Sequence, residues 1–315
     1  MNRHKLVNWI VYGLIFVCAA VLIVLLVGDK RAADEAVARE QRWQEARQPL
    51  IVRRNEIRDE LAVLDRQEAA VTHGSAVVLL FTSPDARVWT EAAPMLQEIG
   101  YPGMIAVSET AFFGDAGCMT AAEALELTGR GWGLCLSADA DTDVAELQQR
   151  VLAAGLPAPQ AVYFPAGDCT PEAAARAAQA GISIVICYGG AAPGTQTPDL
   201  WYVPAQGAMD DNLAHFFEQA VLQRTTLVMT EGWSDPRELF SADDFRISLT
   251  TLQSSEQVDG LRVVTAGQAH ADWMRVEQER AAVAQGNAAR RQELEAELER
   301  VDGQLLETDR QYRQQ

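Results

Sequence analysis

Apolar and polar positions follow three different patterns along the chain, and the first is an unbroken apolar run near the N-terminus. Residues Trp9 to Val27 contain no charged side chain over 19 residues. A helix of that length crosses the hydrocarbon core of a bilayer. The run is longer than the apolar part of a signal peptide and is not followed by a typical cleavage site. The pattern therefore predicts a retained transmembrane helix over residues 9–28, preceded by a leader over residues 1–8.

The second pattern is a seven-residue repeat, which occurs on both sides of the middle of the chain. Over residues 29–73 and 272–315 it predicts two helical coiled-coil arms of similar length. Pro49 is expected to kink or interrupt the first arm. We expect the arms to pair antiparallel, and the alternative is that each arm pairs with its copy in another subunit. The repeating positions are Ala36, Trp43, Leu50, Ile57, Leu64 and Val71 in the first arm, and Leu294, Leu298, Val301, Leu305, Thr308 and Tyr312 in the second.

The third pattern fills residues 74–271, where short apolar runs alternate with helical stretches. Parallel strands buried on both faces read as such continuous apolar runs, so the pattern predicts a compact (β/α) barrel. Glycines mark expected helix ends at positions 100, 129, 155 and 181, and Ser83–Pro84 and Thr170–Pro171 resemble helix starts. The predicted strands are Ala76–Phe81, Met104–Val107, Trp132–Leu136, Ala161–Phe164, Ile182–Cys187, Trp201–Val203, Leu227–Met229 and Leu261–Val264.

Charge and cysteine content limit the partners and the compartment. The formal net charge of −18 argues against nucleic acid as a partner, because nucleic-acid binding needs clustered cations. Arg3 and Lys5 make the leader positive, which favours a cytoplasmic N-terminus and an extracytoplasmic barrel on a single-pass anchor in the cell membrane. Cys118, Cys135, Cys169 and Cys187 allow disulfides there. For Cys135 and Cys187, each inside an apolar run, the sequence favours a buried thiol over a disulfide.

Four segments of the barrel region resemble the polysaccharide deacetylase (NodB-homology) family, which removes acetyl groups from chitin-like or peptidoglycan sugars. The segment 78–84, VLLFTSP, resembles the family's first strand, which normally ends in TFDDG. The segment 99–107, IGYPGMIAV, resembles the second. GWGLCLS at 131–137 lies where the family has GHEIGSH, and YFPAG at 163–167 lies where it has RPPYG. The resemblance implies a distorted (β/α) barrel over most of residues 77–266.

The same resemblance implies that the family's catalytic chemistry is degenerate in this chain. Thr82 stands in the position of the catalytic base, and Ser83, Ser137 and Asp141 stand in the positions of the metal ligands. Tyr163 begins the segment that replaces RPPYG. Two hydroxyls and one carboxylate are a poor ligand set for a water-activating divalent cation. The four histidines, His4, His73, His215 and His270, are too far apart in sequence to form a local metal site. We therefore expect no bound metal, no other cofactor and no metal-dependent deacetylation.

Other polar residues are expected at the mouth of the barrel, where the carboxyl ends of the strands meet. Several carboxylates at one rim allow calcium binding or glycoside hydrolysis. The alternative is that they are helix caps and solvated loop residues. Aromatic side chains such as Trp201, Tyr202 and Trp233 are able to stack on sugars, or else pack in the core. The candidate mouth residues are Asp85, Asp139, Asp141, Asp168, Tyr188, Thr230, Glu231 and Trp233.

These observations leave three functional hypotheses. The first is a membrane-anchored pseudo-deacetylase that binds cell-wall glycan or scaffolds the envelope, with the arms pairing with each other or with a partner protein. The second is an active carbohydrate esterase with an atypical site. The third is a structural coiled-coil envelope protein.

Overall fold

A computed structural model describes residues 3–165, 167–189, 200–208, 213–231 and 242–314. The chain divides into two compact units. One contains residues 1–70 with 282–315, and the other contains residues 71–281. Glu231 is described in its backbone only, and Trp233 lies outside the described residues.

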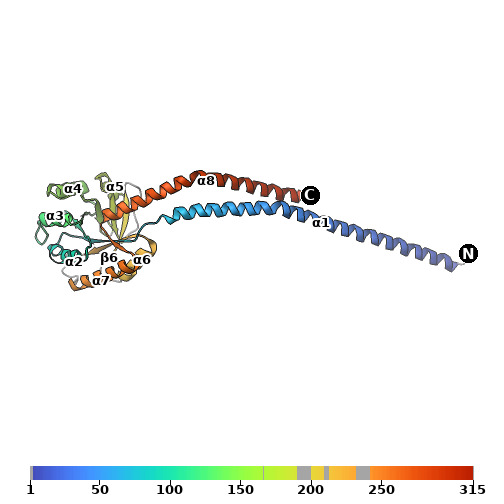
Figure 1. Cartoon of the computed structure of the whole chain (residues 1–315), viewed down its shortest axis with the longest axis horizontal. Coiled ribbons are helices and arrows are strands. Elements are labelled where there is room, and N and C mark those ends of the chain that lie inside the picture. Colours follow the sequence, from blue (N-terminus) through green and yellow to red (C-terminus); the bar gives the residue numbers. More distant parts are fainter. Residues whose placement is uncertain (1–2, 166, 190–199, 209–212, 232–241, 315) are drawn as a thin grey trace. The chain divides into compact units, whose positions relative to one another are not determined.

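Residues 71–281 form a closed barrel of seven parallel strands, with an eighth strand at its edge (Figure 1). All eight strands predicted from the apolar runs are present, and three of them have the predicted bounds. The strands are β1 (Ala76–Phe81), β2 (Met104–Val107), β3 (Gly133–Ser137), β4 (Ala161–Phe164), β5 (Ile184–Tyr188), β6 (Trp201–Ala208), β7 (Thr226–Glu231) and β8 (Arg262–Val263). The parallel (β/α) barrel expected from the sequence is therefore confirmed.

Closure of the barrel depends on β1, which pairs with β7 along its whole length on one side. On its other side β1 pairs with β8 at Ala76 and Val77, and with β2 only at Leu80 and Phe81. Two different strands therefore share one edge of β1. The N-terminal part of β1 pairs with β8, the last strand, and its C-terminal part pairs with β2, the next strand.

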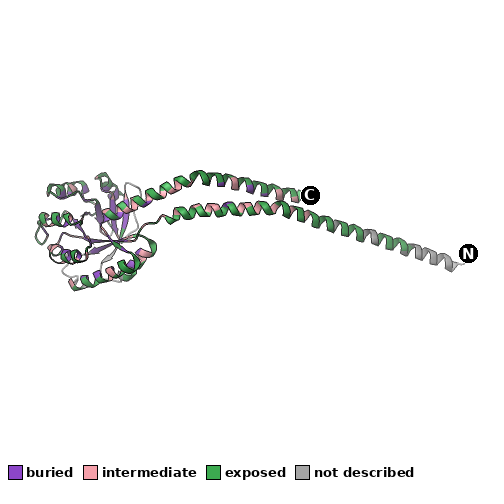
Figure 2. Ribbon diagram, in the orientation of Figure 1, coloured by how far each residue is buried: buried purple, intermediate pink, exposed green. Residues whose placement is uncertain are grey.

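The strands are covered outside by helices, and the residues between these layers form the larger core. Val77, Leu79 and Phe81 of β1 face this outer layer, whereas Val78 and Leu80 face the barrel interior. Figure 2 shows the strands buried and the outer faces of the surrounding helices exposed. The helices are η1 (Val88–Ala92, a π-helical turn), α2 (Ala93–Ile99), α3 (Ala121–Gly129), α4 (Val144–Ala153), α5 (Pro171–Gln179), α6 (Leu213–Gln223) and α7 (Ala242–Asp259).

Helix starts and stops in the barrel follow local side-chain chemistry. Thr170 caps α5 as predicted, because its hydroxyl accepts from the backbone N–H of Ala173, with Pro171 in the first turn. The predicted start at Ser83–Pro84 is wrong. Asp85 takes this role by accepting from the N–H of Arg87 at 2.8 Å. Gly129 does not end α3 in a left-handed conformation, and Gly131 does, with φ of 93°.

The unit of residues 1–70 and 282–315 contains two long helices, α1 (Arg3–Ala70) and the C-terminal part of α8 (Ala266–Gln314). The predicted interruption at Pro49 does not occur, because Pro49 lies inside α1. α8 begins at Ala266, within the residues predicted to belong to the barrel. In the apolar run of residues 9–27, the side chains at 9–13, 15 and 23–25 lie outside the description. Over the described residues, no helix has an apolar stretch long enough to cross a membrane.

Side-chain contacts between these two helices run in antiparallel order. Tyr312 donates to Glu40, Trp43 to Asp309, and Arg53 forms two hydrogen bonds with Glu297 at 2.8 and 2.9 Å. An apolar cluster lies among these polar contacts. Its buried members are Ile57, Leu294, Val301 and Leu305, and its partly buried members are Leu50, Ile51, Leu61, Leu64 and Leu298. Most of these residues occupy the seven-residue repeat seen in the sequence.

Candidate functional site

Several barrel strands carry hydroxyl groups at their carboxyl ends, at positions that continue the inward-facing pattern. Cys135 and Ala161 face the interior, and successive strand residues alternate between faces. Ser137 at the end of β3 therefore faces inward beside Tyr163 of β4, with which it is in register. Tyr188 ends β5 on the same face and packs against the interior cluster. Thr230 of β7 is buried and in register with Leu80.

Thr82 and Ser83 follow β1 directly, and both are half buried. Ser108 has the equivalent place after β2, two residues beyond inward-facing Ala106, and its hydroxyl accepts from the N–H of Ala111 at 3.0 Å. The sequence reading missed Ser108. Met104 and Ala106 face the barrel interior, so the alternation of strand residues predicts that residue 108 faces inward too. The same argument applies to Ser137, two residues after Cys135.

Tyr163 is buried in this layer, to the same extent as Thr230. Burial raises the pKa of its phenol to about 12, and neighbouring Tyr188 and Cys135 act in the same direction. The phenol is therefore neutral at physiological pH and retains its proton as a hydrogen-bond donor. A neutral phenol with neighbouring hydroxyls suits binding of a polar uncharged ligand, and it does not supply a base of ordinary strength.

The acidic candidate residues after β3 form hydrogen bonds within their own loop and to the start of α4. One oxygen of Asp139 accepts from the Thr142 hydroxyl at 2.7 Å and from the N–H of Asp141 at 3.0 Å. The Thr142 hydrogen bond, followed by that of Asp141, lowers the pKa of Asp139. Asp143 caps α4 by accepting from the N–H of Glu146. Arg176 of α5 donates to the carbonyl of Ala140, which holds the loop from outside.

The remaining acidic candidates lie in separate loops. Asp85 caps the helix after β1, as described above, and pairs through its backbone with Cys118. Asp168 is half buried in the turn after β4, where its backbone N–H donates to Pro165 and its carbonyl accepts from Thr170. Asp141 is exposed. Among the described residues, no three His, Cys, Asp or Glu side chains gather closely enough to hold a metal ion.

The side chains at the barrel mouth do not fit the divalent metal ion that the resembled deacetylase family binds. Ser83 and Ser137 offer neutral hydroxyls in place of anionic or imidazole ligands, and Asp141 is the one carboxylate among the three. His73 and His270 do not approach the mouth, since His73 precedes β1 and His270 packs beside Trp201 at the N-terminal end of β6. No step is therefore assigned to a metal in this barrel.

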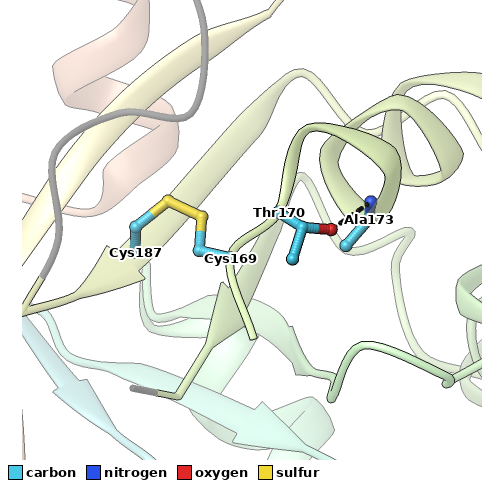
Figure 3. Close-up of a disulfide and its surroundings, with 4 residues drawn as sticks. All are labelled: Cys169, Thr170, Ala173 and Cys187. Atoms are coloured by element: carbon cyan, nitrogen blue, oxygen red, sulfur yellow. Dashed lines mark hydrogen bonds between the residues drawn. A yellow bond between two sulfur atoms is a disulfide. The ribbon is translucent and has the colours of Figure 1, made fainter. Parts of the chain in front are cut away.

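A disulfide joins the loop after β4 to the end of β5, between Cys169 and Cys187 (Figure 3). The two Cα atoms lie 5.6 Å apart. The interpretation of Cys187 as a buried thiol is wrong. Cys135 is buried and free as expected, and burial raises the pKa of its thiol. The missing signal was spatial, because 18 residues of sequence separate the partners and only parallel pairing of β4 with β5 brings them together.

No protein-family description matches the sequence, and no curated protein matches it. Among solved structures, the chain is similar to a family 4 acetyl xylan esterase from Clostridium thermocellum in complex with a cobalt ion. The identity is 16% and the TM-score 0.41, over 62% of this chain and 90% of that chain. A mutant of the peptidoglycan deacetylase PdaC from Bacillus subtilis has 13% identity and a TM-score of 0.40, over 70% and 97% of the two chains.

A third similar structure is a mutant of a CE4 family pseudoenzyme with restored enzymatic activity. It has 10% identity and a TM-score of 0.39, over 62% of this chain and 68% of that chain.

Proposed function

We propose that the barrel is a catalytically inactive deacetylase-like module that binds an uncharged glycan of the cell envelope at its mouth. The observation that carries the proposal is the composition of the inward-facing layer at the carboxyl ends of the strands. Among its described positions are hydroxyl and phenol groups, with Ser137 beside Tyr163, Tyr188 on β5 and Thr230 on β7, next to the apolar residues Ile186 and Ala205. Such groups donate to and accept from sugar hydroxyls and acetamido groups without removing protons from water.

The chain as a whole is proposed to be a single-pass membrane protein, with residues 9–28 in the bilayer and the barrel outside the cytoplasm. Two observations support this proposal. Described side chains of the apolar run, including Leu14, Phe16 and Leu22, are more than half exposed, and a bilayer would cover them. The disulfide between Cys169 and Cys187 is of a kind that persists in oxidising compartments.

Metal content and turnover test the catalytic part of the proposal. The full chain, purified in detergent and dialysed, is expected to hold no stoichiometric zinc, cobalt or nickel by elemental analysis. It is expected to release no acetate from acetylated chitooligosaccharides. A variant with Thr82→Asp, Ser83→Asp, Ser137→His and Asp141→His provides the matched comparison for metal uptake. Metal-dependent acetate release by the native chain, abolished by Asp141→Ala and retained in Asp143→Ala, would favour the active esterase instead.

Binding without turnover tests the other part. Calorimetric titration with chitooligosaccharides is expected to show saturable binding that Tyr188→Ala weakens by about tenfold, the effect of losing about 1.4 kcal/mol of interaction. Replacement of the exposed residue Glu172 on α5 by Gln is the control. Absence of glycan binding in the native chain would contradict the receptor role and leave the structural envelope protein as the better hypothesis.

A further inference from the structure

A cavity of about 530 Å³ lies at the N-terminal end of the barrel, at the opposite end from the mouth. We call it the basal cavity. Its walls include Trp201–Pro204 of β6 and Thr226–Leu227 of β7. The paired residues of these two strands run from Ala205↔Val228 to Ala208↔Thr230, at the carboxyl ends. The cavity therefore occupies the region before this pairing begins, and α6 and the first turns of α8 complete its walls.

The lining combines an apolar wall with three arginines. Trp201, Phe216 and Leu227 contribute to the apolar wall. Arg262 pairs with Asp272 at 2.6 Å, and Arg280 pairs with Glu277 at 2.6 Å. Carboxylates within the cavity therefore already neutralise two of the three cations.

Arg224 is the third arginine, and it differs from the other two. Its guanidinium donates to the neutral hydroxyl of Thr72, and no described carboxylate lies within ion-pair distance of it. Thr72 adjoins His73, which also lines the cavity. Nε2 of His73 contacts Glu277 at 3.1 Å, whereas its Nδ1 is buried and has no hydrogen-bond partner among the described residues. An unneutralised cation and an unpartnered ring nitrogen therefore lie on one wall.

The backbone of Arg224 is held in a conformation that favours glycine. Each of the six helices α2 to α7 is followed by a residue with positive φ, and five of these residues are Gly100, Gly131, Gly155, Gly181 and Gly260. After α6 the residue is Arg224, with φ of 51°, the one non-glycine residue with positive φ in the described chain. The left-handed region is strained for a residue with a Cβ. Glycine would end α6 more easily, so the fold does not explain the arginine.

We propose that the basal cavity binds a small organic acid. The oxyanion of the ligand lies against the guanidinium of Arg224 and beside His73, and its uncharged part lies against Trp201 and Phe216. A guanidinium fork matches the two oxygens of a carboxylate, and the cavity volume is in the range of small-molecule sites. The backbone strain at Arg224 is the cost of placing this side chain at the cavity. The proposal does not depend on the function proposed for the mouth.

Calorimetric titration of the full chain in detergent tests this site with three probes: phenylacetate, its neutral counterpart phenylacetamide, and inorganic phosphate. We expect one equivalent of phenylacetate to bind, at least tenfold more tightly than phenylacetamide or phosphate. Arg224→Gly is expected to weaken phenylacetate binding at least tenfold without lowering the thermal midpoint of the protein, because glycine relieves the strain. Arg246→Gln removes a different exposed arginine, on α7, and is expected to leave binding unchanged.

Four results would overturn the proposal, three of them from the titrations and one from thermal unfolding. The first is no phenylacetate binding by the native chain, and the second is equal binding by the native chain and Arg224→Gly. The third is phosphate binding as tight as that of phenylacetate, which would assign the cavity to an inorganic anion. A lower thermal midpoint for Arg224→Gly would show that the arginine serves the fold, and would remove the reason for assigning it to a ligand.

Discussion

His270 shows how one half-buried ring couples the stability of the barrel to pH. It stacks on Trp201, with ring centroids 5.5 Å apart, and on Trp273, at 6.1 Å. Its Nε2 is buried and has no hydrogen-bond partner among the described residues. Burial disfavours the charged imidazolium and lowers the pKa of His270 below its ordinary value of 6.5. The folded protein therefore holds this ring neutral at a pH where the unfolded chain protonates it.

We expect this ring to make the protein less stable in mild acid. The contribution of His270 is fully present above about pH 6.5 and is lost as the pH falls through the lower pKa of the folded state. His270→Phe keeps a flat ring between the indoles and cannot titrate. Thermal midpoints measured at pH 7.5 and pH 5.5 should therefore differ less in His270→Phe than in the native chain. An equal loss in both proteins would contradict the assignment, and replacement of exposed His215 by Gln is the control.

Residue roles were predictable from sequence where the interaction is local. Thr170 caps the helix that starts one residue later, and such caps depend on positions two or three residues apart. The partnership of Cys169 with Cys187 and the cavity position of Arg224 depend on strand order, which no local pattern contains. The hydroxyl layer of the mouth lies between these cases. Alternation predicts which residues face inward, but the register of Ser137 with Tyr163 had to come from the structure.

Among the elements, β6 shows where the apolar pattern stops being informative. The sequence predicted a strand over Trp201–Val203, which ends before Pro204, and proline lacks a backbone N–H and is rare inside central strands. The strand instead continues to Ala208, and Pro204 is in register with Cys187 of β5. The other neighbour, β7, pairs with β6 only from Ala205 onward and with a register shift. Reduced pairing on that side tolerates the proline and leaves space for the basal cavity.

The helix pair of α1 and α8 depends on a small apolar cluster, which makes single substitutions informative. Leu294 is fully buried in this cluster, whereas Leu306 of the same helix is 65% exposed. Leu294→Ala is expected to destabilise the pair by about 2–5 kcal/mol, and Leu306→Ala by no more than about 0.5 kcal/mol. Backbone hydrogen exchange along α1 near Ile57 measures the difference. Equal exchange in the two variants would contradict the contact between these helices.

At the scale of the whole chain, one helix crosses the boundary that the sequence predicted between the barrel and the second arm. The second arm was predicted from residue 272, yet α8 begins at Ala266, and Ala266 and Ala269 are buried in the barrel interior cluster. Alanine is frequent both in long polar helices and in tightly packed contacts. Composition therefore did not separate the part of α8 that packs on the barrel from the part that pairs with α1.

The proposed topology makes a prediction for intact cells. With residues 9–28 in the cell membrane and the short basic leader in the cytoplasm, the proposed topology puts the barrel outside the cytoplasm. Protease added to spheroplasts should therefore degrade residues 74–271, and a tag at the N-terminus should survive until the membrane is permeabilised. Protection of the barrel in intact spheroplasts would contradict the proposed orientation. A cytoplasmic protein assayed in the same samples reports on lysis.

Because α1 contacts the end of α8, the two sides of their apolar cluster are synthesised at different times on the ribosome. Ile57 and Leu64 leave the exit tunnel early, but Leu294 and Leu305, in the same apolar cluster, are about 240 residues further along the chain. At roughly 5–20 residues per second, translation of that interval takes on the order of 10–50 seconds. Throughout that time the apolar stripe of α1 has no partner from its own chain. We therefore expect a chaperone, or a neighbouring nascent chain, to cover that stripe until synthesis is complete.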